Sequence, residues 1–282
     1  MKPDSVTNLT EAAASVFQAG RRARWELMHR TPLAFPTHHP QGLAFARDRI
    51  FLSSVEVPAD ENSGIGHVFV LDAQGTLVRD ITLGHGEVYH PGGLDFDGAS
   101  LWVPVAEYRP SSTSIVFTID PVTLSVEERF RVADHVGWVV SDPESGVVHG
   151  GSWGSRRLST WSQQGAELDS WENPSSFVDY QDAQYLGGGR VLCSGIAELP
   201  SQRGSARFEL GGIAMIDFPG HRIVNEMPVA LFSEGGHVVT RNPFALSVDS
   251  GDLMMHVAPD DGTEAGGTGA GGTELLTYRA AS

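Results

Sequence analysis

Short apolar stretches alternate with turn-forming residues along the whole chain, and one pattern of apolar and polar positions returns at intervals. It is clearest at residues 39–45 (HPQGLAF) and 90–96 (HPGGLDF), and residues 242–248 (NPFALSV) keep the proline and the apolar alternation. Looser copies stand at residues 135–140 (HVGWVV) and 180–186 (YQDAQYL). A spacing of about 45 to 60 residues between copies is typical of repeat architectures.

Each copy leads into a turn containing glycine or aspartate, and then into a second apolar stretch. Such turns reverse the chain into hairpins. The predicted second strands cover residues 50–55, 100–105, 147–152, 190–196 and 252–257. Units of this kind, each made of four antiparallel strands, predict an all-β fold, a β-propeller of five blades.

The last repeat has room for only three strands, which end at residues 274–278, while the apolar stretch at residues 24–28 precedes the first repeat and is unassigned. We therefore expect the N-terminal stretch to supply the outer strand of the last blade and close the ring, which protects both sheet edges. Residues 24–282 then form a single propeller domain, and residues 1–23 form a tail or a short helix.

The formal net charge of −16 makes nucleic acid and an anionic membrane improbable partners. The N-terminus lacks the apolar core of a signal peptide, and no stretch reaches the ~18 apolar residues of a membrane span, so we expect a cytoplasmic protein. Cys193 is the single cysteine, which excludes an intrachain disulfide and a thiolate metal cage. The oligomeric state is left open.

The first strand of every propeller blade lines the central channel, so residues at one repeat position converge on the axis. That position holds His39, His90 and Asn242, and the two looser copies offer His135 or Asp134 and one of Tyr180, Gln181 or Asp182. Imidazoles with an amide suit Zn, Fe, Mn or Cu better than Ca, so we expect a divalent metal at His39, His90, His135 and Asn242. Alternatively, these histidines bond only to one another and to water.

Acidic residues follow the second strands, whose ends return to the mouth of the channel where the histidines stand. They are Glu56, Glu107 and Glu198, with Asp260 in a comparable place in the last repeat. A carboxylate there could act as general base or orient a metal-bound histidine, or it could simply be solvated. We take Glu107, Glu56 and Glu198 as candidate catalytic residues, with Glu107 or Glu56 as the base.

Aromatic and polar residues near the same mouth could line a pocket for a small molecule. They are Tyr89, Tyr108, Trp153 and Tyr180, together with Gln181 and Asp182 from the loose fourth copy. The aromatic side chains could equally well pack between blades.

The Pro40-Gln41-Gly42-Leu43 and Pro91-Gly92-Gly93-Leu94 segments, each followed by an Asp/Gly turn, resemble blades of the SMP-30/gluconolactonase and strictosidine-synthase-like superfamily, and of streptogramin B lyase. The resemblance covers most of residues 39–278. It implies a propeller that uses a divalent metal at the channel mouth for lactone hydrolysis or ring-opening elimination. Those families commonly have six or seven blades and mostly oxygen ligands, whereas this chain has five repeats and offers imidazoles.

The leading hypothesis is a metal-dependent enzyme that hydrolyses a small organic substrate, such as a lactone or ester, or acts on it by elimination. A first alternative is a non-catalytic propeller that binds a small molecule or a protein loop at the same mouth. A second is a redox enzyme with a histidine-ligated metal, an oxygenase or oxidase.

Overall fold

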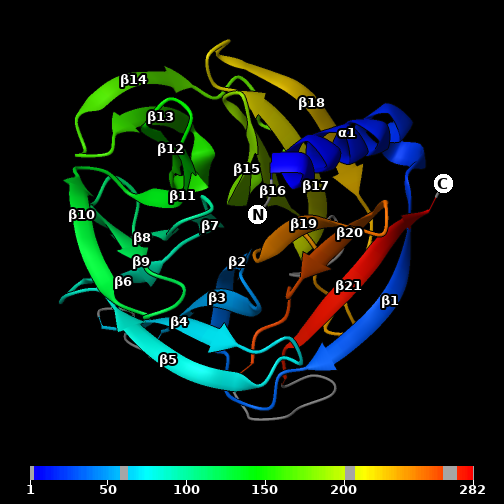
Figure 1. The fold of residues 1–282 in the computed structure, drawn as a ribbon, viewed down its shortest axis with the longest axis horizontal. Coiled ribbons are helices and arrows are strands. Elements are labelled where there is room, and N and C mark those ends of the chain that lie inside the picture. Colours follow the sequence, from blue (N-terminus) through cyan, green and yellow to red (C-terminus); the bar gives the residue numbers. More distant parts are fainter. Residues whose placement is uncertain (1–2, 58–62, 201–206, 263–271, 282) are drawn as a thin grey trace.

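The computed structural model describes residues 3–57, 63–200, 207–262 and 272–281. Five small sheets are arranged in a ring around a common centre, which Figure 1 shows face-on. The protein is therefore an all-β propeller of five blades, as the repeat predicts. The predicted second strands correspond to β3 (Arg49–Glu56), β8 (Leu101–Glu107), β12 (Val147–Ser152), β16 (Arg190–Pro200) and β20 (Asp252–Val257).

Each blade is a small antiparallel sheet with its first strand innermost. Blade 1 contains β2 (His39–Ala46), β3 (Arg49–Glu56), β4 (Ile65–Leu71) and β5 (Leu77–Leu83). Blade 2 contains β6 (Val88–Pro91), β7 (Asp95–Phe96), β8 (Leu101–Glu107), β9 (Ser114–Ile119) and β10 (Val126–Val132). Blade 3 contains β11 (Val136–Asp142), β12 (Val147–Ser152), β13 (Arg157–Ser162) and β14 (Glu167–Glu172), with the short 3-10 helix η2 (Trp153–Ser155) after β12.

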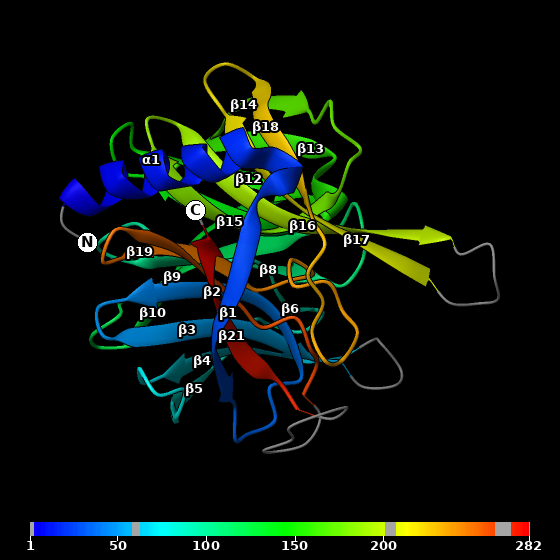
Figure 2. The ribbon, with the colours of Figure 1, turned by 90° about the vertical axis from the view of Figure 1, so that its right-hand side faces the viewer.

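Blade 4 contains β15 (Asp179–Gly187), β16 (Arg190–Pro200), β17 (Arg207–Asp217) and β18 (Arg222–Val229). Its hairpin β16–β17 extends beyond the other blades, as Figure 2 shows. Blade 5 contains β19 (Phe244–Asp249), β20 (Asp252–Val257), β21 (Glu274–Ala281) and, as its outer strand, β1 (Arg24–Pro32).

The ring is closed by pairing between the two ends of the chain. Strand β1 runs antiparallel to β21, with Trp25 opposite Ala280 and Leu27 opposite Tyr278. This pairing confirms the predicted closure by an N-terminal strand. Because the strands come from opposite ends of the sequence, their hydrogen bonds join the first described segments of the chain to the last.

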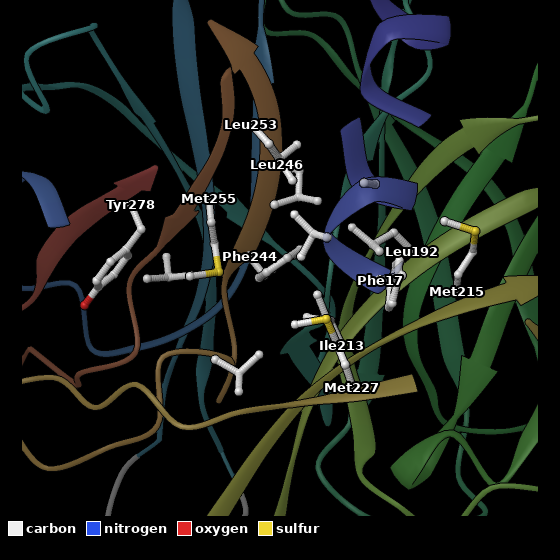
Figure 3. Close-up of a cluster of buried hydrophobic side chains, with 14 of the residues drawn as sticks. Phe17, Leu192, Ile213, Met215, Met227, Phe244, Leu246, Leu253, Met255 and Tyr278 are labelled. Carbon is white, nitrogen blue, oxygen red and sulfur yellow. The ribbon is translucent and has the colours of Figure 1, made fainter. Parts of the chain in front are cut away.

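Helix α1 (Pro3–Ala19), followed by the 3-10 turn η1 (Gly20–Arg22), packs on blades 4 and 5. Its residues Leu9, Ala13, Val16 and Phe17 are buried in a core cluster with side chains of both blades, part of which Figure 3 shows. The Thr10 hydroxyl donates to the carbonyl of Leu186, near the C-terminal end of β15. Among the described residues, none of the helices has the length and apolar character needed to cross a bilayer.

The centre of the ring is occupied by one fully buried carboxylate, that of Asp182 on β15. Its Oδ2 accepts the amide hydrogens of Leu43 and Phe244 at 2.9 Å each, and its Oδ1 accepts those of Leu94 at 3.1 Å and Ala183 at 2.9 Å. These donors come from blades 1, 2, 4 and 5. Asp182 therefore fixes the inner strands relative to one another, and its carboxylate is taken up by the backbone rather than by the pocket for which the sequence proposed it.

The repeat glycines leave the space that this carboxylate needs. A Cβ atom on Gly93 would lie 2.6 Å from Oδ1 of Asp182, and one on Gly42 would lie 2.7 Å from the Cα of Gly93. Gly93 also donates its amide hydrogen to the carbonyl of Gly137 at 2.8 Å, which joins blade 3 to the other inner strands at the axis. The small residue of the repeat is thus required by close packing at the axis.

Replacing Asp182 with alanine should destabilise the protein strongly, because it leaves several buried amide hydrogens without an acceptor. Each such group costs about 1–3 kcal/mol, so we expect a loss of at least about 3 kcal/mol in the free energy of unfolding, measured by denaturant titration. Asp72→Ala is the matched control, since Asp72 also accepts two backbone amides but in an exposed turn where water can replace it. Equal losses in the two variants would contradict the role assigned to Asp182.

Candidate functional site

A pocket of about 510 Å³ opens at the mouth of the central channel, where the inner strands begin. All five blades contribute to its wall, as expected for positions related by the repeat. The residues proposed from the sequence that line it are His39, His90, His135, Asn242, Tyr108, Trp153, Tyr180, Gln181 and Glu198. The repeat thus places residues far apart in the sequence around one cavity.

His135 is held in one orientation at the start of blade 3. It is 4% exposed, and its Nδ1 lies 2.9 Å from the carbonyl oxygen of Glu107. A carbonyl only accepts, so Nδ1 carries the proton and Nε2 keeps a lone pair. Burial lowers the pKa of His135, which favours the neutral ring. The alternative residue at this repeat position, Asp134, instead accepts the backbone amide of His135 at 2.8 Å.

His90 lies beside His135, with 6.1 Å between the two ring centroids. It is 7% exposed, and its pKa is held well below the usual value by burial and by the neighbouring His135 and His39. Its Nδ1 is buried and has no hydrogen-bond partner among the described residues. Since a buried N–H without an acceptor is rare and costly, the favoured tautomer has its proton on Nε2. His90 and His135 are therefore neutral rings of opposite tautomers.

His39 has a different partner, a carboxylate from blade 5. Its Nδ1 lies 2.7 Å from Oδ1 of Asp261, which also pairs with Arg241 at 3.1 Å. Burial opposes the charge of Asp261, but the hydrogen bonds from His39 and Arg241 keep the pKa of this carboxyl below its usual value. The sequence reasoning missed Arg241 and Asp261. The only signal was the neighbouring acidic residue Asp260, whose Oδ1 instead accepts the hydroxyl of Ser233 at 2.5 Å.

Two aromatic side chains cover the imidazoles. The ring of Tyr108 stacks on His90 at 4.6 Å, and Trp153 meets His135 edge-on at 4.7 Å. Tyr108 and Trp153 are themselves 6.0 Å apart and partly exposed, so they form the outer wall of the pocket. Tyr180 lies deeper and is almost fully buried.

Four proposed residues do not line this pocket. Tyr89 is buried against Gly64, and Asp182 lies at the centre of the ring, where it accepts backbone amide hydrogens. Glu56 lies beside His38 and His67 on the edge of blade 1. Glu107 accepts the hydroxyl of Thr113 at 2.7 Å and pairs with Arg109 at 2.5 Å.

The partners of Glu107 decide its chemistry. The hydrogen bond from Thr113 and the charge of Arg109 lower the pKa of its carboxyl, although burial acts in the opposite direction. A carboxylate stabilised in this way is a weaker base than the sequence hypothesis required. Its contribution to the pocket is the backbone carbonyl that orients His135.

The pocket histidines do not form a compact set of metal ligands. His38, Glu56 and His67 do form such a set, because their ligand atoms all lie within 4.8 Å of one another. No other group of three histidine or acidic side chains among the described residues meets this distance. His39, His90 and His135 share the cavity but are spaced more widely than that. Their placement gives no support to an ion bound by all three.

Residues 15–268 match the family DUF6454, a family of unknown function. The chain belongs to this family. Comparison with curated proteins finds no matching sequence.

Solved structures similar to this DUF6454 chain share its fold at low sequence identity. A glutaminyl cyclase from Myxococcus xanthus is 13% identical with a TM-score of 0.55, over 92% of this chain and 98% of that one. The tail fibre of Staphylococcus aureus phage P68 is 7% identical with a TM-score of 0.54, over 96% of this chain and 56% of that one. Such likenesses show the propeller fold alone, and the resemblance to the SMP-30/gluconolactonase superfamily is likewise supported only as far as the propeller architecture.

The protonation of the two central imidazoles can be tested by NMR titration of the histidine rings. We expect His90 and His135 to titrate below the ordinary value of about 6.5, with His90 the lower of the two, because it is also repelled by neighbouring imidazolium charge. His135→Asn removes one of those charges and should raise the pKa of His90. A His90 pKa at or above the ordinary value would contradict the neutral state assigned to this ring.

Proposed function

We propose that the protein is an enzyme that acts on a small polar organic molecule in the channel-mouth pocket, by hydrolysis of an ester or lactone. The observation that carries the proposal is the paired arrangement of His135 and His90, one oriented as a proton acceptor and the other as a donor. The propeller fold is compatible with catalysis, since a glutaminyl cyclase is among the structures that share it.

In this proposal His135 is the general base. Its Nε2 accepts a proton from water as the water oxygen bonds to the carbonyl carbon of the substrate. The bond from that carbon to the leaving oxygen then breaks, and the proton passes from His135 to the leaving oxygen. The Nε2–H of His90 donates to the carbonyl oxygen and stabilises the negative charge that develops there.

The rest of the pocket suits a small polar substrate. Its volume of about 510 Å³ is in the usual range for small-molecule sites of about 300–1,000 Å³. The amides of Gln181 and Asn242 and the guanidinium of Arg241 offer hydrogen bonds to carbonyl or hydroxyl oxygens, and Tyr108 and Trp153 offer an apolar wall. Glu198 is the one candidate carboxylate after a second strand that reaches this cavity, and its catalytic role stays a prediction.

The test is turnover of a panel of lactones and esters by the wild-type protein and by His135→Asn. Loss of a general base costs about 10²–10⁴-fold in rate, so we expect His135→Asn to lose at least about a hundredfold in kcat. His90→Asn should lower kcat as well, because the oxyanion loses a donor.

The matched control is His221→Asn. His221 is an exposed histidine that pairs with Asp169, at the turn between β17 and β18, and it should leave turnover unchanged. Thermal unfolding of all variants separates a catalytic loss from a loss of fold. Unchanged kcat in a folded His135→Asn would refute the mechanism, and tight binding of panel members without any turnover would refute the enzyme in favour of a binding propeller.

A further inference from the structure

A second cluster of histidine and acidic side chains lies outside the pocket, on the edge of blade 1. His38 immediately precedes β2, Glu56 ends β3, and His67 lies on β4, so the three residues lie on or next to neighbouring strands. His38 also exchanges backbone hydrogen bonds of 2.8 Å in both directions with Gly262, which belongs to blade 5. The cluster therefore sits where the first and last blades meet.

The atoms of this cluster that could bind an ion lie close together. Oε2 of Glu56 lies 4.0 Å from Nε2 of His38 and 4.0 Å from Nε2 of His67. Bonds from a zinc ion to nitrogen or oxygen are about 2.1 Å long, so one ion can join atoms up to about 4.2 Å apart. These separations are too long for hydrogen bonds but within the reach of a shared ion.

His67 is prepared for this role by its surroundings. It is 7% exposed, and its Nδ1 lies 3.0 Å from Oδ1 and 3.2 Å from Oδ2 of Asp80. A carboxylate fixes the proton on Nδ1, which leaves a lone pair on Nε2. That Nε2 is buried and has no hydrogen-bond partner among the described residues. A carboxylate behind a histidine is the usual support of a metal-binding imidazole.

We propose that His38, Glu56 and His67 bind a divalent first-row transition-metal ion such as zinc, with Asp80 as the positioning residue for His67. Two imidazoles and one carboxylate are a common protein ligand set for such ions and leave further positions for water or another ligand. The site is distinct from the pocket, and the proposal does not depend on the reaction proposed there.

Binding requires one adjustment, and the structure indicates which side chain makes it. The rings of His38 and His67 are nearly parallel, 14° apart with centroids at 5.1 Å, so both lone pairs cannot point at one ion as they stand. His67 is fixed by Asp80 and by stacking on Phe69 at 5.1 Å. His38 is partly exposed and rotates about its side-chain bonds, while the exposed carboxylate of Glu56 closes the remaining distance.

The test measures zinc binding directly, by calorimetric titration of tag-free, chelator-treated full-length protein. We expect one zinc ion per chain, and a rise in Tm on adding zinc because the ion binds the folded state. His67→Asn and Glu56→Gln should each weaken binding at least tenfold, and Asp80→Asn should weaken it by about 10–100-fold. Glu56→Gln changes an exposed side chain, so it remains informative if His67→Asn fails to fold.

His90→Asn and His135→Asn are the matched controls, since they remove pocket histidines and should retain zinc affinity and the rise in Tm. Cobalt(II) absorption in the visible range should report imidazole ligation in the wild type and disappear in His67→Asn. Absence of stoichiometric zinc would overturn the proposal, as would zinc binding that survives His67→Asn and Glu56→Gln but is lost in the pocket variants. None of these readouts uses turnover, so this proposal and the proposed reaction can fail separately.

Discussion

The structure depends on one buried carboxylate at the propeller axis. The side chain of Asp182 accepts amide hydrogens from the inner strands of four blades, and the contact of Gly93 with Gly137 adds the fifth. Hydrophobic packing between blades is non-directional, so it fills the ring without specifying the rotation of each inner strand. Hydrogen bonds to a single acceptor are directional, and they fix the inner strands relative to one another.

Fixed inner strands explain why the pocket exists, but not what it can do. The repeat puts histidine at the same position in several blades, and the surroundings of Nδ1 then differ from ring to ring. It meets the carboxylate of Asp261 in His39 and a backbone carbonyl in His135, and in His90 it has no hydrogen-bond partner among the residues that the structure describes. Identical side chains thereby acquire different hydrogen-bonding roles. Architecture follows from what the blades share, whereas the chemistry follows from the residues in which they differ.

The features that the blades share could be predicted from the sequence, whereas several features in which they differ could not. The repeat predicted the blades, the closure by β1 and most of the cavity wall, because these depend on periodicity. The repeat did not predict that Asp182 lies at the axis instead of in the pocket. The register of β15 shifts between Tyr180 and Asp182, so the simple alternation of side chains no longer holds there. The repeat also gave no indication of Arg241 and Asp261, because these residues lie in connections of blade 5 outside the repeated segment. Long-range partners of this kind leave no local pattern.

The expectation of a histidine-bound metal shows how geometry selects among chemically similar residues. Residues at one repeat position surround a channel, and the ligand atoms of His39, His90 and His135 do not all lie within 4.8 Å of one another. The ligand atoms of His38, Glu56 and His67, which come from neighbouring strands of one sheet, do all lie within 4.8 Å of one another. His38 and His39 are adjacent in sequence, but only His39 enters the channel. A metal is therefore better accommodated within a blade, by His38 and its strand neighbours, than between blades at the axis.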